Sequence, residues 1–251
     1  MERPILLLVG IVAILLGWQT VSMLLAQADM PIARFLPPPS AVAEQGATLI
    51  GTAAFWKAMG ASNARVVAAF AAAMFFGVTI GLLTAWRPEI RALLQPALVL
   101  WRYTPVAAIV PLSIIFFGVS DLQKVAVLFM GCVFYVVVLT QDAILRFPIS
   151  HIDTARSLGL GRTEVFRRVV VPGIAPEIFD TARVAIGLAW SYLLVAEVVA
   201  AESGMGFILM RAMRFLQVEQ MYFLTLVLAV LGLIYDYAFV LSRRFIFPWI
   251  Q

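Results

Sequence analysis

The chain contains six apolar runs, each long enough to cross a lipid bilayer as a helix. An α-helix rises about 1.5 Å per residue, so roughly 20 residues cross the ~30 Å hydrocarbon core. Hydrophobic residues make up 63% of the sequence and charged residues only 13%, and a water-soluble core could not bury that much apolar surface. We therefore predict an all-α, polytopic membrane protein with a single transmembrane domain over residues 1–251. The six expected spans cover residues 5–26, 62–85, 93–118, 124–144, 178–201 and 221–241.

The first apolar run is either a signal peptide or a retained first span. The run at 5–26 is longer than the apolar region of a typical signal peptide, and no small-residue cleavage site follows it. These features favour the retained span. In the loop that follows, Pro37-Pro38-Pro39 favours a stiff extended segment, and we expect a helix over 41–59 at or near the membrane surface.

The basic residues indicate how the spans are oriented. With the amino terminus in the cytoplasm, the inner segments hold twice as many arginines and lysines as the outer segments. Cytoplasmic segments of membrane proteins carry such an excess. We therefore expect both termini in the cytoplasm. The formal net charge of +4 then reflects these loops rather than binding to nucleic acid.

The longest polar interruption in the second half of the chain runs from Ser150 to Pro172. Its pattern predicts a helix, a glycine turn, a second helix and a proline stop. The residues that carry this pattern are Ser150 and Asp153 as a capping box, Gly159 and Gly161 at the turn, Thr163 and Glu164 at the second helix start, and Pro172 at the end. The apolar side of this hairpin comprises Leu158, Leu160, Val165, Phe166 and Val169. That side either lies on lipid headgroups or fits a groove on a soluble partner.

The hairpin segment resembles the cytoplasmic EAA loop of ABC importer permeases. That loop reads Glu-Ala-Ala, three residues, Gly, nine residues, then Ile-x-Leu-Pro. With the same spacing, this chain has Asp153-Thr154-Ala155, then Gly159, then Val169-Val170-Val171-Pro172. The replacements keep the negative charge and the apolar character of the pattern.

Three further segments resemble the nitrate, sulfonate and taurine branch of these importers. They are Phe35-Leu-Pro-Pro-Pro-Ser40, Trp101-Arg-Tyr-Thr-Pro105 with Ile109-Val-Pro-Leu112, and Ala196-Glu197 with Ser203-Gly-Met-Gly-Phe207. The resemblance implies a type I importer permease with a six-span core in the bacterial inner membrane. It also implies a second permease copy, usually as a homodimer in this branch, and two cytoplasmic ATPase subunits that bind ATP and Mg. A periplasmic substrate-binding protein would deliver the solute.

The same resemblance implies that the loop at 146–173 couples the permease to the ATPase. ATP binding would draw two such hairpins together and rock the pathway open to the outside. Asp153 would cap the hairpin or pair with an ATPase cation, and Gly159 would allow the tight turn. The coupling residues that we expect are Asp153, Thr154, Ala155, Leu158, Gly159, Gly161, Phe166 and Pro172. The sequence has no GxxxxGK[ST] phosphate loop, so we expect a transport subunit rather than an enzyme.

Polar and amphipathic groups inside the spans are candidates for the translocation pathway, because such groups tend to face cavities. The candidates are Arg102, Tyr103, Trp190, Tyr192 and Glu197. Each has a structural alternative: the aromatic residues pack, Arg102 snorkels to the interface, and Glu197 pairs with Arg183 or with an outer-loop arginine. Among them, Arg102 is the candidate for contact with an anion. Two outer-loop arginines, Arg211 and Arg214, are candidates for docking of the binding protein.

Two features of the second span concern its packing. Gly77 and Gly81 form a GxxxG pair, which either permits close approach of another helix or is ordinary span composition. Arg65 lies near the outer end of the span and can snorkel to the interface.

Two other function classes compete with an importer. A membrane enzyme needs convergent acids, bases or metal ligands, and one histidine with scattered carboxylates and no metal-ligand cluster argues against it. An ion channel or proton-coupled carrier without an ATPase is the alternative function. A carrier should show midplane carboxylates in paired halves and has no use for the 150–172 hairpin. The expected solute is a small anion such as nitrate, a sulfonate, taurine or a related organic acid.

Overall fold

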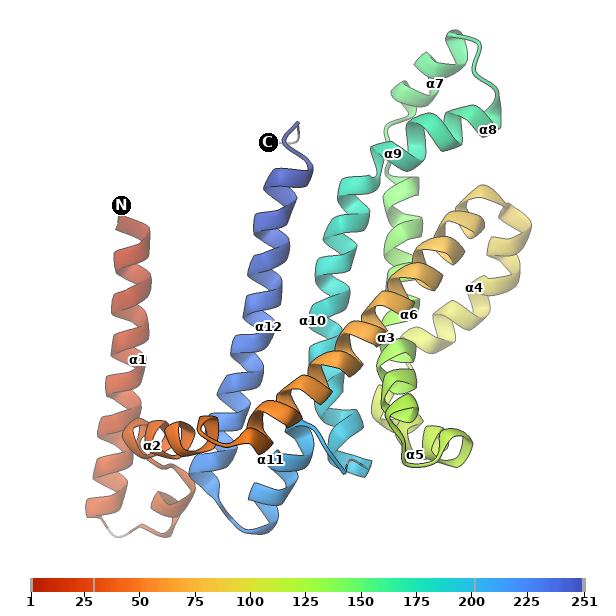
Figure 1. Ribbon diagram of the computed structural model, residues 1–251. Coiled ribbons are helices and arrows are strands. Elements are labelled where there is room, and N and C mark those ends of the chain that lie inside the picture. Colours follow the sequence, from red (N-terminus) through yellow and green to blue (C-terminus); the bar gives the residue numbers. More distant parts are fainter. Residues whose placement is uncertain (1, 29, 201, 250–251) are drawn as a thin grey trace. The chain divides into compact units, whose positions relative to one another are not determined.

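The computed structural model describes residues 2–28, 30–200 and 202–249, and these residues form helices joined by short turns (Figure 1). In chain order the elements are α1 (Glu2–Gln27), the 3-10 helix η1 (Pro31–Phe35), α2 (Pro39–Ile50), α3 (Ala53–Trp86), α4 (Pro88–Arg102), α5 (Val106–Phe117), α6 (Asp121–Leu145), α7 (Ile149–Ser157), α8 (Arg162–Val165), the π-helix η2 (Phe166–Val170), α9 (Val171–Gly173), α10 (Ala175–Ala200), α11 (Met205–Arg214) and α12 (Val218–Ile246). The all-helical class predicted from the sequence is confirmed.

Within the described residues, five helices are long and apolar enough to cross a membrane. They are Val9–Gln27, Ala53–Trp86, Asp121–Leu145, Ala175–Val199 and Val218–Ile246. A sixth crossing would be a broken one, made by α4 and α5, whose axes meet at 104°. Five or six spans agree with the polytopic fold expected from hydropathy.

The break between α4 and α5 differs from the single span expected at 93–118. Tyr103 and Thr104 follow α4, and Pro105 precedes α5 in an extended conformation, with φ −64° and ψ 126°. A residue before proline avoids the α region, and proline offers no N–H to continue the helix. The sequence therefore contains the physical cause of the break.

The region before the second span also differs from expectation. The helix predicted over 41–59 ends at Ile50, and a turn at Gly51 and Thr52 separates it from α3. As a result α3 begins at Ala53 and is 34 residues long, rather than starting near residue 62.

The chain divides into two compact units. The first comprises Met1–Ala61 with Glu202–Val230, and the second comprises Ser62–Ala201 with Leu231–Gln251. The single domain expected for residues 1–251 stays a prediction.

The first unit is held together around the segment that follows η1. The Ser22 hydroxyl donates to the Leu36 carbonyl oxygen at 2.7 Å, and the Tyr222 hydroxyl donates to the Phe35 carbonyl oxygen at 3.2 Å. The rings of Trp18 and Tyr222 lie 5.5 Å apart. These contacts join α1, the Phe35–Leu36 segment and the beginning of α12.

The second unit is built on the packing of α6 against α10. The face of α6 that contains Val127, Leu128, Cys132 and Val136 is fully buried. The buried face of α10 contains the small residues Ala182, Ala185, Ala189 and Ala196, which allow a close approach. Near the middle of the pair, Cys132 Sγ lies 3.6 Å from the Ala185 carbonyl oxygen.

Helix α3 packs directly on α6 through the two glycines of the GxxxG pair. A Cβ atom at Gly77 would lie 2.6 Å from Val136 Cβ, and one at Gly81 would lie 2.6 Å from Thr140 Cβ. Real Cβ atoms do not approach that closely, so glycine is required at both positions for this packing. The close-approach interpretation of this pair is confirmed.

Candidate functional site

The polar hairpin begins with α7, which ends in a turn centred on Gly159. Gly159 has φ +86°, a left-handed conformation that costs a residue with a side chain about 1–2 kcal/mol. The N–H of Gly159 donates to the Arg156 carbonyl oxygen at 2.9 Å, and the N–H of Leu160 donates to the Ala155 carbonyl oxygen at 3.2 Å. These two bonds make a Schellman helix end. The predicted glycine turn is confirmed at Gly159.

The start of the hairpin differs from the predicted capping box at Ser150 and Asp153. Helix α7 begins at Ile149, directly after Pro148, and the Ser150 carbonyl already accepts a bond from the Thr154 hydroxyl inside the helix. Proline favours helix initiation because its φ is fixed near the helical value, so the helix starts before Ser150. A capping interaction is present instead at the second helix.

That second helix is opened by Glu164. Its Oε2 atom accepts a hydrogen bond from the Gly161 N–H at 3.2 Å, and Gly161 is the residue before α8. The predicted start of a second helix near Thr163 and Glu164 is confirmed to within two residues.

Pro172 does not end the second helix, contrary to the sequence prediction. The chain continues from η2 through α9 and, after a turn at Ile174, into α10. In η2 the Val171 N–H donates to the Phe166 carbonyl, which is the wider π-helical register. The extra residue in this turn makes room where the proline ring would otherwise meet a carbonyl of the preceding turn.

The hairpin carries its own small core. Ala155, Val165, Val170 and Ile174 are buried, with Phe147 and Phe166 among the partly buried residues packed on them. Ala155 and Phe166, from the predicted coupling set, therefore hold the hairpin together from inside.

The other residues of the predicted coupling set lie on the outer surface of the hairpin. Asp153, Thr154, Leu158, Gly159, Gly161 and Pro172 are all exposed. Leu158 was expected on the apolar side, but it points outward with 76% of its surface exposed. The hairpin thus presents a polar surface with one protruding leucine beside a rigid turn.

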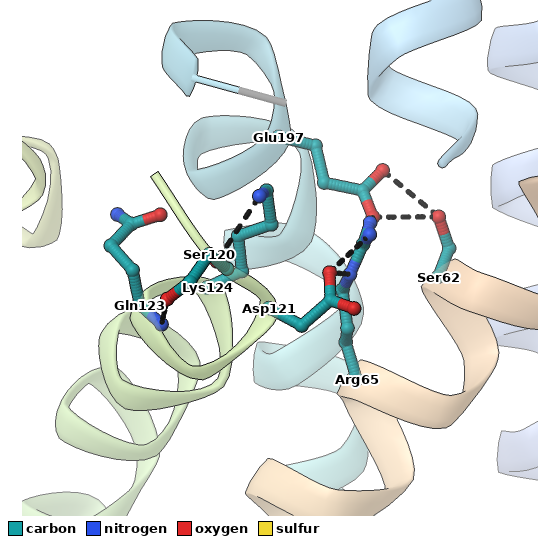
Figure 2. Close-up of polar contacts among 7 residues, drawn as sticks. All are labelled: Ser62, Arg65, Ser120, Asp121, Gln123, Lys124 and Glu197. Atoms are coloured by element: carbon teal, nitrogen blue, oxygen red, sulfur yellow. Dashed lines mark hydrogen bonds and ion pairs between the residues drawn. The ribbon is translucent and has the colours of Figure 1, made fainter. Parts of the chain in front are cut away.

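A second cluster of functional interest comprises Ser62, Arg65, Asp121 and Glu197. We call it the buried ionic cluster, because all of these side chains except that of Asp121 are buried. Figure 2 shows the guanidinium of Arg65 between the two carboxylates. Arg65 Nη1 lies 2.5 Å from Glu197 Oε1, and Arg65 Nη2 lies 2.6 Å from Asp121 Oδ1. The Ser62 hydroxyl lies 2.7 and 2.9 Å from the two Glu197 oxygens. Three helices, α3, α6 and α10, are joined by these contacts.

The buried ionic cluster corrects two expectations. Arg65 does not snorkel, because only 3% of its side chain is exposed. Glu197 is paired with Arg65, whereas Arg183 forms two short bonds of 2.5 and 2.7 Å to Asp236. Ser62 and Arg65 are one turn apart on α3, so both face Glu197 at once.

A lysine adjoins this cluster on α6. Lys124 is 3% exposed, and its ammonium donates to the Ser120 carbonyl oxygen at 3.1 Å (Figure 2). Sequence reasoning placed Lys124 at the edge of a span and missed its burial.

The remaining pathway candidates are spread over the second unit. Trp190 is buried, with its ring 5.7 Å from that of Tyr235, and the Tyr192 ring fills the space next to Gly131. Tyr103 is exposed at the α4–α5 break. The side chain of Arg102 lies outside the described part of the chain. The structure brings none of the three aromatic candidates into contact with Glu197 by any described bond.

The two docking candidates belong to the first unit. Arg211 and Arg214 are exposed in the last turn of α11, where positive charge complements the helix dipole.

Sequence comparison identifies the group of proteins to which this chain is similar. Residues 77–247 match the family described as binding-protein-dependent transport system inner membrane component. The chain is 31% identical over 255 residues to the taurine transport system permease protein TauC of Escherichia coli (strain K12), which covers 99% of this chain and 91% of TauC. It is 30% identical over 249 residues to the putative aliphatic sulfonates transport permease protein SsuC of the same organism, covering 98% and 91% of the two chains.

Comparison with solved structures supports the same fold. An inward-facing conformation of the MetNI methionine ABC transporter matches with a TM-score of 0.64 and 17% identity, over 73% of this chain and 92% of that chain. At this identity the likeness concerns the fold alone. It indicates that this part of the chain shares the helical fold of that transporter chain.

Proposed function

Because the chain belongs to the family of binding-protein-dependent transport system inner membrane components, we propose that it moves a small anionic solute and is driven by a separate ATPase through the 150–172 hairpin. The chain is the permease component of an ABC importer rather than its ATPase, and it is a multi-pass inner-membrane protein. Such a permease implies ATPase and binding-protein partners.

The observation that carries the coupling proposal is the construction of the hairpin. Of its outward residues, Asp153 lies on α7 and Leu158 directly follows it, and both are held by the Schellman turn at Gly159 and the small core beneath it. A rigid, exposed hairpin can transmit a displacement from a partner protein without deforming. The hairpin also leads directly into α6 at one end and α10 at the other, so a displacement reaches both helices.

The proposed assembly has two permease copies, two ATPases and one binding protein. A closed two-fold pair is the commonest symmetry of oligomers, and each hairpin would engage one ATPase. We place the hairpin and both termini in the cytoplasm. The exposed arginines of the hairpin then lie on the side of the membrane that holds the excess of basic residues, as is usual for cytoplasmic segments. Arg211 and Arg214 would then face the binding protein.

The proposed solute is a sulfonate or a related small anion. Support comes from the similar permeases TauC and SsuC, whose names refer to taurine and to aliphatic sulfonates. We retain Arg102, Tyr103, Trp190 and Tyr192 as pathway candidates. For Glu197, neutralisation by Arg65 favours a role in positioning α10 over direct contact with an anion.

The test is uptake into proteoliposomes that contain the permease with its ATPase and binding-protein partners. We expect labelled taurine or an alkanesulfonate to accumulate only when ATP is present on the hairpin side, and unlabelled sulfonate to compete. Uptake by the purified permease alone, without ATP, would instead support the channel or carrier alternative. ATP-driven uptake of an unrelated cationic solute would contradict the proposed substrate class.

A further inference from the structure

The carboxyl end of α3 is attached to the coupling hairpin by Trp86. The guanidinium carbon of Arg162 lies 4.8 Å from the centre of the Trp86 ring, and Arg162 Nη2 donates to the Trp86 carbonyl oxygen at 3.2 Å. The rings of Trp86 and Phe166 lie 4.6 Å apart. We call Trp86, Arg162 and Phe166 the hairpin clamp. It holds α3 to the α8–η2 arm through a ring contact, a cation–π contact and a backbone bond.

From the hairpin clamp, α3 runs without a break to the buried ionic cluster. Residues 65–86 belong to one helix, so Arg65 and Trp86 are separated along it by about 30 Å at ~1.5 Å per residue. The helix is not free to bend independently of α6. Gly77 and Gly81 pack against α6, and Gln141 Nε2 donates to the buried Thr84 hydroxyl at 2.6 Å.

We propose that the hairpin clamp makes α3 a third arm of force transmission, beside the two helices that the hairpin joins through the chain. This inference rests on the proposed coupling function. When an ATPase displaces the hairpin, α6 and α10 follow because they are covalently connected to it. Helix α3 has no such direct connection, and the contacts of Trp86 with Arg162 and Phe166 add a direct link to the hairpin beside its packing on α6. Trp86 and Arg162 are thus positioning residues that carry the motion to Arg65 at the far end.

The competing explanation is that Trp86 is an interfacial anchor. Tryptophan is common at the membrane–water boundary, and Trp86 ends a span. An anchor depends on the ring and the lipid, but not on Arg162. Trp249, which is exposed near the end of the chain and contacts Phe247, provides a matched tryptophan outside the hairpin clamp.

The experiment compares Trp86→Ala, Trp86→Phe, Arg162→Gln and Trp249→Ala in the complete transporter in proteoliposomes. The measured quantity is solute transported per ATP hydrolysed, together with the amount of ATPase that copurifies. We expect Trp86→Ala and Arg162→Gln each to lower this ratio roughly fivefold, within the range seen for contacts that link distant sites. The amount of ATPase that copurifies should be unchanged in these variants. Trp86→Phe should retain most of the wild-type ratio, and Trp249→Ala should leave the ratio unchanged.

Arg162→Gln keeps the test decisive even if Trp86→Ala folds poorly, because Arg162 is exposed and its replacement leaves the Trp86 ring in place. A wild-type ratio in Arg162→Gln would overturn the inference, as would an equal loss in Trp249→Ala. Failure of the proposed function looks different, because the wild-type transporter would then show no ATP-dependent uptake. A double variant that loses no more than either single variant would show that the two residues act as one unit.

Discussion

Arg65 Nη1 and Glu197 Oε1 lie 2.5 Å apart although 132 residues separate them in the chain, and both side chains are almost completely buried. A buried ion pair offers little net stability compared with apolar residues, but removal of one partner leaves an uncompensated charge. The pair therefore fixes which face of α3 packs against α10. Its loss should lower the stability of the isolated permease.

Removal of either partner should destabilise the protein. We expect Arg65→Ala and Glu197→Gln each to cost about 3–5 kcal/mol, the usual penalty for breaking a buried pair. The midpoint of thermal unfolding in detergent measures this effect. Asp121→Asn is the matched control, because the Asp121 side chain is 75% exposed and its loss should change the midpoint little. A similar loss in all three variants would contradict a special role for the buried pair.

Substitution at the hairpin turn should impair coupling without preventing insertion. Gly159→Val forces a β-branched residue into φ +86°, which should deform the end of α7 and lower substrate-stimulated ATPase activity. Gly232→Ala on α12 is the control, since an added Cβ there would meet nothing within 4 Å and Gly232 lies outside the hairpin. Normal stimulation in Gly159→Val would refute the assigned role of this turn.

The α3–α6 contact should not tolerate larger residues. Gly77→Val and Gly81→Val should each destabilise the permease by about 1–3 kcal/mol, because overpacking forces the two helices apart. The same unfolding assay applies. Gly187→Ala on α10 is a suitable comparison, as a Cβ there meets nothing within 4 Å, and it should leave the midpoint unchanged or slightly higher.

The ion pair between Arg183 of α10 and Asp236 of α12 should depend on the opposite signs of its two charges. Asp236→Arg alone places two guanidinium groups together, so we expect reduced thermal stability. The double variant with Arg183→Asp and Asp236→Arg should recover part of that loss, because the opposite charges are restored in reversed order. Absence of any recovery would mean that the geometry of the present pair, rather than its charge, matters.

The sequence alone predicted those features whose signals are local. Hydropathy located the five spans that are single helices, and the glycine at position 159 located the hairpin turn, since a left-handed residue is needed there. The capping box at Ser150 was wrong because Pro148 starts the helix earlier. The stop at Pro172 was wrong because a π-helical turn accommodates the proline.

The contacts between distant segments could not be predicted. Arg65 and Glu197 each suit several partners by charge, and only the packing of three helices selects the pair that forms. The same holds for Trp86 and Arg162, which lie 76 residues apart and are not among the residues that define the hairpin pattern. Pro105 was visible in the sequence, but a proline inside an apolar run is compatible with a kink or with a full break.

The interruption between α4 and α5 has a consequence for its surroundings. The first N–H groups of a helix lack partners within it, and α5 starts where α4 has already ended. Hydrocarbon chains cannot solvate peptide groups, so irregular backbone at membrane depth survives only beside water or other polypeptide. A crossing made by α4 and α5 together would therefore need water or neighbouring protein, rather than lipid tails, around Tyr103 and Thr104.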